Sequence, residues 1–271
     1  MPGSYTHYRF GRDVLPLLPV ELHARIDSHR SLFDLGLHGP DIFFYYNPLR
    51  KNPVNRLGHR MHTESGQAVF RRFAALDDGT NASFAYLAGF LCHFALDSLC
   101  HGYVEEMTAM GMSHTLLEAQ LDRAFLLRDG RDPLTADLAA HIRPKSQNVR
   151  VISRFFPQLT ENHVERTLKD VVFYHKLLLA KQKPKRATLN LVFRVANLQD
   201  GFGAMVMREN EVPACVPMVK HLQELHEEAI PAAVELISRY PELDADRYAF
   251  DFNGTLVPPV RGLPSEARPG V

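Results

Sequence analysis

The chain has 271 residues and equal numbers of acidic and basic side chains, 31 of each, so its formal net charge is zero. Its 45% hydrophobic and 23% charged residues are ordinary for a globular protein that buries a large core. The balanced charge excludes a polybasic nucleic-acid binder. Three cysteines are too few for a disulfide framework. With no secretory signal or membrane span in the sequence, we expect a cytoplasmic protein.

The first half of the chain predicts one long loop and two helices. Residues 36–58 are rich in Pro and Asn, so we expect a long loop with short helical pieces, a kind of segment that often carries function. Residues 84–107 are apolar nearly all round and predict a central helix covered on several sides. A second helix is predicted over residues 113–127 with Ser113 as its N-cap, and a turn over 129–133.

The second half also reads as helical. Helical patterns cover residues 136–142, 147–155, 161–181, 187–194 and 216–240, and no window shows strand alternation. We therefore predict an all-α protein with a metal-binding core at 1–130, a helical extension at 131–257 packed on the same domain, and an irregular tail at 258–271. The sequence does not indicate an oligomeric state.

Histidine is the unusual component of the composition. Nine of the 14 histidines fall within the first 114 residues, and imidazole is the commonest metal ligand in proteins. His93, Asp97 and His101 are spaced by four, which places them along one face of the central helix. A carboxylate among apolar neighbours is costly to desolvate, and a divalent cation would offset that cost. A single His-x3-Asp pair on a helix is commonly explained by packing. Three potential ligands at the same spacing favour a metal site.

Further candidates lie on both sides of this helix. His114 and Glu118 form a His-x3-Glu pair that suits zinc, whereas Asp122, one turn later, is interpreted as a surface charge outside the site. Upstream, Asp41 precedes an aromatic run at 43–46 that suits core packing better than a substrate mouth. The remaining candidate ligands in this region are His7, His59 and His62, with His62 preferred over His59.

Three short motifs, GPDIFFY at 39–45, HFALDSLCHGY at 93–103 and HTLLE at 114–118, resemble the zinc-dependent phospholipase C family over about residues 5–125. That family has an all-helical fold around a trinuclear zinc cluster, and fungal single-strand nucleases share its architecture. The resemblance implies a first metal held by Asp41, His62, His93 and Asp97. It implies a second metal held by His101, His114 and Glu118, and a third held by His7 and a bridging Asp97.

The chain departs from the family pattern in having no tryptophan, since the secreted members complete the third metal with an N-terminal tryptophan. We therefore expect two ions rather than three. Zinc is the expected metal, although the ligand types also suit iron or manganese.

The expected function is hydrolysis of a phosphodiester or phospholipid-like substrate by metal-activated water, with Asp41 as the catalytic carboxylate. The expected partner is a small phosphoester or a phospholipid headgroup. Alternatives are a non-catalytic metal-binding protein and a nuclease of the same fold. A His-Asp phosphohydrolase is disfavoured because no adjacent His-Asp pair occurs.

Overall fold

The computed structural model describes residues 3–242 and 248–257, and the all-α prediction is confirmed for them. The helices are α1 (Ser4–Val14), η1 (Leu15–Leu17), α2 (Val20–Asp27), α3 (Arg30–Gly36), η2 (Gly39–Tyr45), α4 (Pro53–Thr63), α5 (Gly66–Leu76), α6 (Asn81–Ala109), α7 (His114–Arg128), α8 (Ser146–Phe155), α9 (Glu161–Leu178), α10 (Lys183–Val195), η3 (Gln199–Gly203), η4 (Pro213–Cys215) and α11 (Val216–Arg239). No strand occurs in these ranges, where an isolated bridge joins Phe250 and Leu256.

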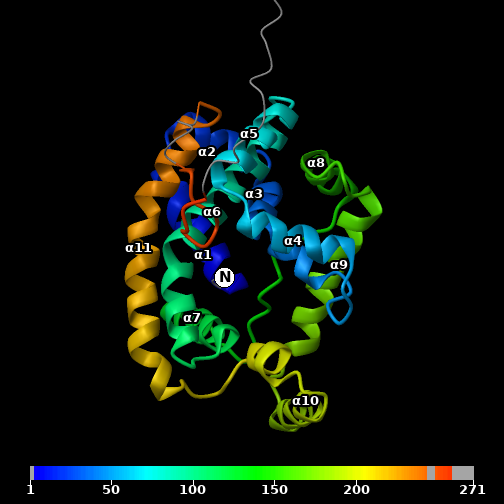
Figure 1. Ribbon diagram of the computed structural model, residues 1–271, viewed down its shortest axis with the longest axis vertical. Coiled ribbons are helices and arrows are strands. Elements are labelled where there is room, and N and C mark those ends of the chain that lie inside the picture. The colour runs from blue at the N-terminus through cyan, green and yellow to red at the C-terminus, as the bar shows by residue number, and fades with distance from the viewer. Residues whose placement is uncertain (1–2, 243–247, 258–271) are drawn as a thin grey trace, which may run out of the picture.

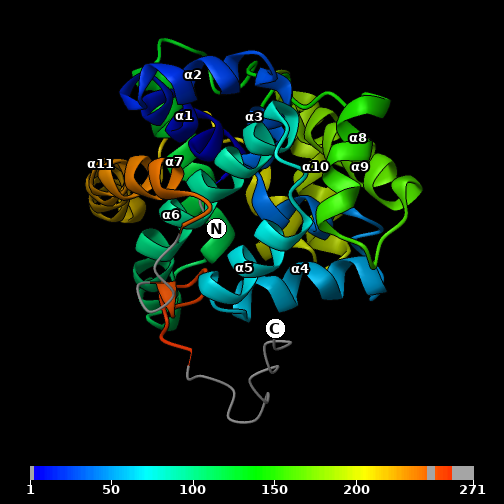
Figure 2. The ribbon, with the colours of Figure 1, turned by 90° about the horizontal axis from the view of Figure 1, so that it is seen from above.

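Helix α6 is the centre of the molecule. Thr80 caps its start, since the hydroxyl accepts a hydrogen bond from the Ser83 N–H. In two perpendicular views α6 runs between α11 on one side and α8 and α9 on the other (Figures 1 and 2). Within the described part of the chain, α6 alone is long and apolar enough to cross a membrane. However, 89% of its apolar window is buried, as in the core helix of a globular fold.

Helix α3 crosses α6 at very close range. A Cβ atom on Gly89 of α6 would lie 2.2 Å from the Phe33 carbonyl oxygen, and one on Gly36 would lie 2.2 Å from the Tyr86 carbonyl oxygen. Two glycines therefore face each other at the crossing and let the backbones touch. This contact fixes the segment that follows α3, which carries Asp41.

Helix α10 is peripheral. Its buried residue Phe193 belongs to a small apolar cluster with Leu178, Ala180 and Val206, separate from the main core. In Figure 1, α10 lies at the end of the molecule opposite α5. The helix is held to the fold by one small cluster and presents most of its surface to solvent.

Several predicted boundaries changed. The helix predicted over 136–142 is wrong: this stretch is a series of turns, in which the carboxylates of Asp132 and Asp137 accept hydrogen bonds from the backbone N–H two residues on. Such side-chain bonds compete with helix formation. The expected loop at 36–58 contains η2 and the start of α4. These two elements correspond to the short helical pieces that were predicted within it. The predicted tail at 258–271 lies outside the described residues, and the division at residue 130 stays a prediction.

Candidate metal centre

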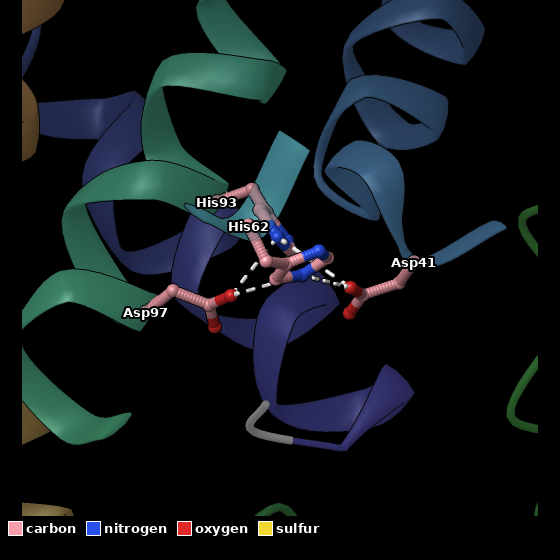
Figure 3. A group of neighbouring side chains, drawn as sticks. All are labelled: Asp41, His62, His93 and Asp97. Atoms are coloured by element: carbon pink, nitrogen blue, oxygen red, sulfur yellow. Dashed lines mark hydrogen bonds and ion pairs between the residues drawn. The ribbon is translucent and has the colours of Figure 1, made fainter. Parts of the chain in front are cut away.

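Asp41, His62, His93 and Asp97 come from three elements and converge on one point. All four side chains are buried, and one ligand atom of each lies within 4.8 Å of the others. Figure 3 shows the two imidazoles between the carboxylate of Asp97 on α6 and that of Asp41 on η2. His62 Nε2 is 3.0 Å from Asp41 Oδ1, and His93 Nε2 is 3.1 Å from Asp97 Oδ2.

The orientation of both imidazoles is set by backbone carbonyls. His62 Nδ1 lies 2.8 Å from the Gly58 oxygen, and His93 Nδ1 lies 3.2 Å from the Leu37 oxygen. A carbonyl oxygen can only accept, so each Nδ1 carries the proton and each Nε2 presents a lone pair to the cluster. This is the arrangement in which metal-binding histidines are held.

The surroundings of Asp97 indicate whether the first group can hold a cation. Its side chain is fully buried, and neither of its oxygens has a hydrogen-bond partner; the same holds for His93 Nε2. Burial favours the protonated carboxyl, but the imidazoles of His93 and His101 offset it and hold the pKa of Asp97 well below its usual value. A buried carboxylate with unsatisfied oxygens beside imidazole lone pairs fits a divalent cation.

A second group follows directly. His101, His114 and Glu118 bring one ligand atom each within 4.8 Å of one another, and His114 Nε2 is 2.8 Å from Glu118 Oε1. His101 Nδ1 donates to the Phe252 oxygen at 3.3 Å, which fixes the orientation of the ring. Burial lowers the pKa of His101 to about 4, so the ring is neutral at pH 7. His101 Nδ1 is also 3.8 Å from Asp97 Oδ2, so the two groups adjoin.

His7 joins the cluster from α1. Its Nε2 lies 3.2 Å from Asp97 Oδ1, and its ring stacks on His93 with centroids 4.3 Å apart. Both ring nitrogens are buried without a hydrogen-bond partner. His7 therefore contacts Asp97 through Oδ1, whereas His93 contacts it through Oδ2.

Asp122 corrects one prediction. It is 3% exposed and is not a surface charge. Its Oδ1 accepts hydrogen bonds from Thr6 N at 2.8 Å and Thr6 Oγ1 at 2.7 Å, and its Oδ2 accepts one from Tyr5 N at 3.2 Å. Asp122 thus caps the first turn of α1 from α7 and holds the turn that carries His7. Burial raises the pKa of Asp122 to about 6. Its partners lie 116 residues away, so sequence spacing gave no signal of them.

The two upstream histidines differ in the way the sequence analysis preferred. His62 is buried beside Asp41, whereas His59, three residues earlier on α4, is exposed. The aromatic run divides: Phe43 is fully buried and packs against Phe156, while Phe44 and Tyr45 line a pocket. Part of the run is therefore in the core, as preferred, and a role of the rest in substrate binding stays a prediction.

This pocket of about 240 Å³ reaches both groups. Asp41 of the first group and Glu118 of the second are among its lining residues. Its apolar lining includes Ile42, Phe44 and Pro48 from the first half of the chain. From the second half it includes an apolar wall of Val171, Leu178, Leu179, Phe202, Met205 and Met207. The pocket therefore combines two carboxylates with a largely apolar lining.

His175, from the second half of the chain, lines the pocket, and the sequence analysis did not predict this. His175 Nε2 lies 3.0 Å from Ser4 Oγ and 3.2 Å from the Tyr45 hydroxyl. His38 and His141 share a hydrogen bond of 2.6 Å between their Nε2 atoms. Burial lowers the pKa of His175 to about 4 and that of His141 to about 3, so both act as neutral hydrogen-bonding groups.

Comparison with known proteins agrees with the geometry. The family model for zinc-dependent phospholipase C matches residues 6–169, which is more than half of the chain and extends 44 residues beyond residue 125, where the resemblance was expected to end. No curated protein and no solved structure shows significant similarity to the chain. The match includes every member of both groups and ends before most of the apolar wall. The chain belongs to the zinc-dependent phospholipase C family.

Proposed function

We propose that this protein is a zinc-dependent phosphoesterase that cleaves a phospholipid-like phosphodiester. The observation that supports this most strongly is that Asp41 and Glu118, from two separate groups of potential ligands, line the same pocket. A phosphodiester in that pocket would meet both groups at once. Two ions that grip one phosphate are the common arrangement for in-line displacement at phosphorus.

The proposed ligands follow the two groups. The first ion would be held by Asp41, His62, His93 and Asp97, and the second by His101, His114 and Glu118. His7 and Asp97 are the proposed ligands of any third ion. When bound, zinc supplies Lewis acidity, which lowers the pKa of water at the site and attracts phosphoryl oxygens.

The side chains of the chain itself have distinct tasks. Asp41 belongs to the first group and also faces the pocket, so its carboxylate can accept a hydrogen bond from the attacking water and then its proton. The neutral His175, with Tyr45 and Ser4, can bind uncharged polar atoms of the substrate. The apolar wall excludes water from one side of the site.

The lining of the pocket favours an amphiphilic substrate over nucleic acid. None of the lining residues that the structure describes is Lys or Arg, so a polyphosphate backbone would find no basic groove. The wall of Leu, Val, Phe and Met side chains suits acyl chains instead.

Metal analysis of the purified protein tests the site. We expect two zinc ions per chain, and loss of bound zinc in Asp97→Asn because this carboxylate contacts both groups. His62→Ala and His59→Ala form a matched pair on α4: the first should lose metal and the second should keep it. One ion or fewer per chain, unchanged by Asp97→Asn, would contradict the proposal.

A hydrolysis screen tests the activity. A short-chain phosphatidylcholine, bis(p-nitrophenyl) phosphate and single-stranded DNA differ in whether they carry acyl chains or a polyanionic backbone. We expect the highest kcat/KM on the phosphatidylcholine. Bound metal with no hydrolysis of any of the three would favour a non-catalytic metal-binding protein, and fastest cleavage of DNA would favour a nuclease.

A further inference from the structure

Helix α10 has apolar residues on its solvent side. Its inward face is Arg186, Leu189, Asn190 and Phe193, which are the residues of the helix that are at least partly buried. The positions about 180° away are Thr188, Leu191, Val192 and Val195, with the same i, i+3, i+4, i+7 spacing. Leu191 is 60% exposed, Val192 52% and Val195 81%. A helix that packs on a fold with one apolar face has no need of a second.

The same region carries the strongest charge asymmetry of the chain. Residues 171–199 contain six Lys or Arg residues and no Asp or Glu. The rest of the chain keeps 31 acidic against 25 basic residues, so the balanced net charge conceals one basic segment. Lys181, Lys183 and Arg194 are exposed and form no ion pair with any described residue, whereas Arg186 pairs with Glu209.

The inward face of α10 leads directly to the pocket. The Phe193 ring stacks on Phe202, with centroids 6.1 Å apart and an interplanar angle of 21°. Phe202 in turn lines the pocket that Asp41 and Glu118 share. Phe193 of α10 and the pocket residues Leu178, Phe202 and Met205 thus pack in one small apolar cluster.

We propose that α10 is a membrane-docking helix that lies in the interface of an anionic lipid bilayer. A helix with exposed apolar side chains that carries Lys and Arg and no acidic residue of its own has the composition that binds such surfaces. A second copy of the chain is a poorer occupant, since a two-fold contact through this face would bring like charges together. The docking requires no catalysis; the further step, delivery of a lipid past Phe202 to the pocket, rests on the proposed function.

Vesicle binding of the full-length protein tests the docking. The protein should cosediment with phosphatidylcholine vesicles that contain phosphatidylglycerol, more weakly at high salt and more weakly still with phosphatidylcholine alone. The double variant Leu191→Ser/Val195→Ser should bind the mixed vesicles roughly tenfold more weakly or worse, because two interfacial side chains are lost. Lys183→Glu/Arg194→Glu should weaken binding by at least about tenfold through charge reversal.

A matched control variant is available in the first half of the sequence. Leu17 and Val20 are 58% and 80% exposed, close to the values of Leu191 and Val195. Leu17→Ser/Val20→Ser should therefore bind vesicles within about twofold of the unmodified protein, since it removes equal apolar exposure elsewhere. Equal loss in both double variants, or no binding of the unmodified protein to anionic vesicles, would overturn the proposal. So would a concentration-dependent dimer in solution that Leu191→Ser/Val195→Ser abolishes.

The soluble substrate bis(p-nitrophenyl) phosphate separates docking from chemistry. The α10 variants should hydrolyse it at the rate of the unmodified protein, and should lose activity only on vesicle phospholipid. Vesicle binding that depends on α10, without hydrolysis of any phosphoester, would leave the docking intact and refute the proposed function. Hydrolysis of the soluble diester without vesicle binding would support the proposed function and overturn the docking.

Discussion

Gly89→Ala at the crossing of α3 and α6 is the most informative single change to the fold. The added Cβ would lie 2.2 Å from the Phe33 carbonyl oxygen and 2.9 Å from Gly36 Cα, whereas ordinary contact begins near 3.4 Å. Since both neighbours are backbone atoms, no side-chain rotation relieves the overlap. The two helices must separate by about 1.2 Å, which costs about 3 kcal/mol by analogy with overpacked cores.

Gly102→Ala is the matched control on the same helix. There the nearest atom to the added Cβ is 3.8 Å away, so the substitution should stabilise α6 by up to about 1 kcal/mol. Urea unfolding of both variants, followed by circular dichroism, measures the difference of about 4 kcal/mol. If Gly89→Ala lies within about 0.5 kcal/mol of the unmodified protein, the close crossing is not a constraint and the reasoning fails.

Three further changes are expected to have measurable effects. Asp122→Leu leaves the backbone N–H groups of the first turn of α1 unpaired, and chemical denaturation should show a loss of about 2–3 kcal/mol, whereas Asp122→Asn should lose less. Burial lowers the pKa of His226 to about 3, so only the unfolded chain takes up its proton below pH 6.5, and folded stability falls as pH drops. Between pH 7 and 5 the free energy of unfolding should fall by about 2 kcal/mol from this cause. The fall should be absent in His226→Phe, so identical pH dependence of unfolding in the two proteins would contradict the reasoning. Gly39→Ala places a Cβ 2.3 Å from His93 Cδ2, so metal analysis should show reduced zinc; undiminished zinc content would argue against His93 as a ligand.

Much of the fold was predictable because the longest helices have strong local signals. The apolar run of α6 and the Ser113 cap of α7 are readable over a few turns, and both helices begin and end within three residues of the prediction. The failure at 136–142 has a local cause too, since aspartate side chains compete for the backbone N–H groups. Helix α10 begins at Lys183, four residues before the predicted start, because Pro184 fits the first turn of a helix.

The candidate site was predictable where its residues share a helix and unpredictable where tertiary structure unites them. His93, Asp97 and His101 lie four residues apart, so helix geometry alone aligns them. The role of Asp122 depends on partners in α1, and that of His175 on Ser4 and Tyr45, at separations of more than 100 residues. No periodic pattern connects residues so far apart; a buried aspartate and a buried histidine look the same in sequence as exposed ones.

The hydrogen bond from His101 to the Phe252 carbonyl joins residues 151 positions apart and has a consequence for biosynthesis. The ribosome releases residue 252 well after residue 101, so the nascent chain cannot orient His101 through this bond until the segment around residue 252 has emerged. The rings of His62 and His93 in the first group also pack on Phe252, with centroids 5.5 and 6.0 Å apart. Both groups should therefore reach their final geometry only after the segment that carries Phe252 docks.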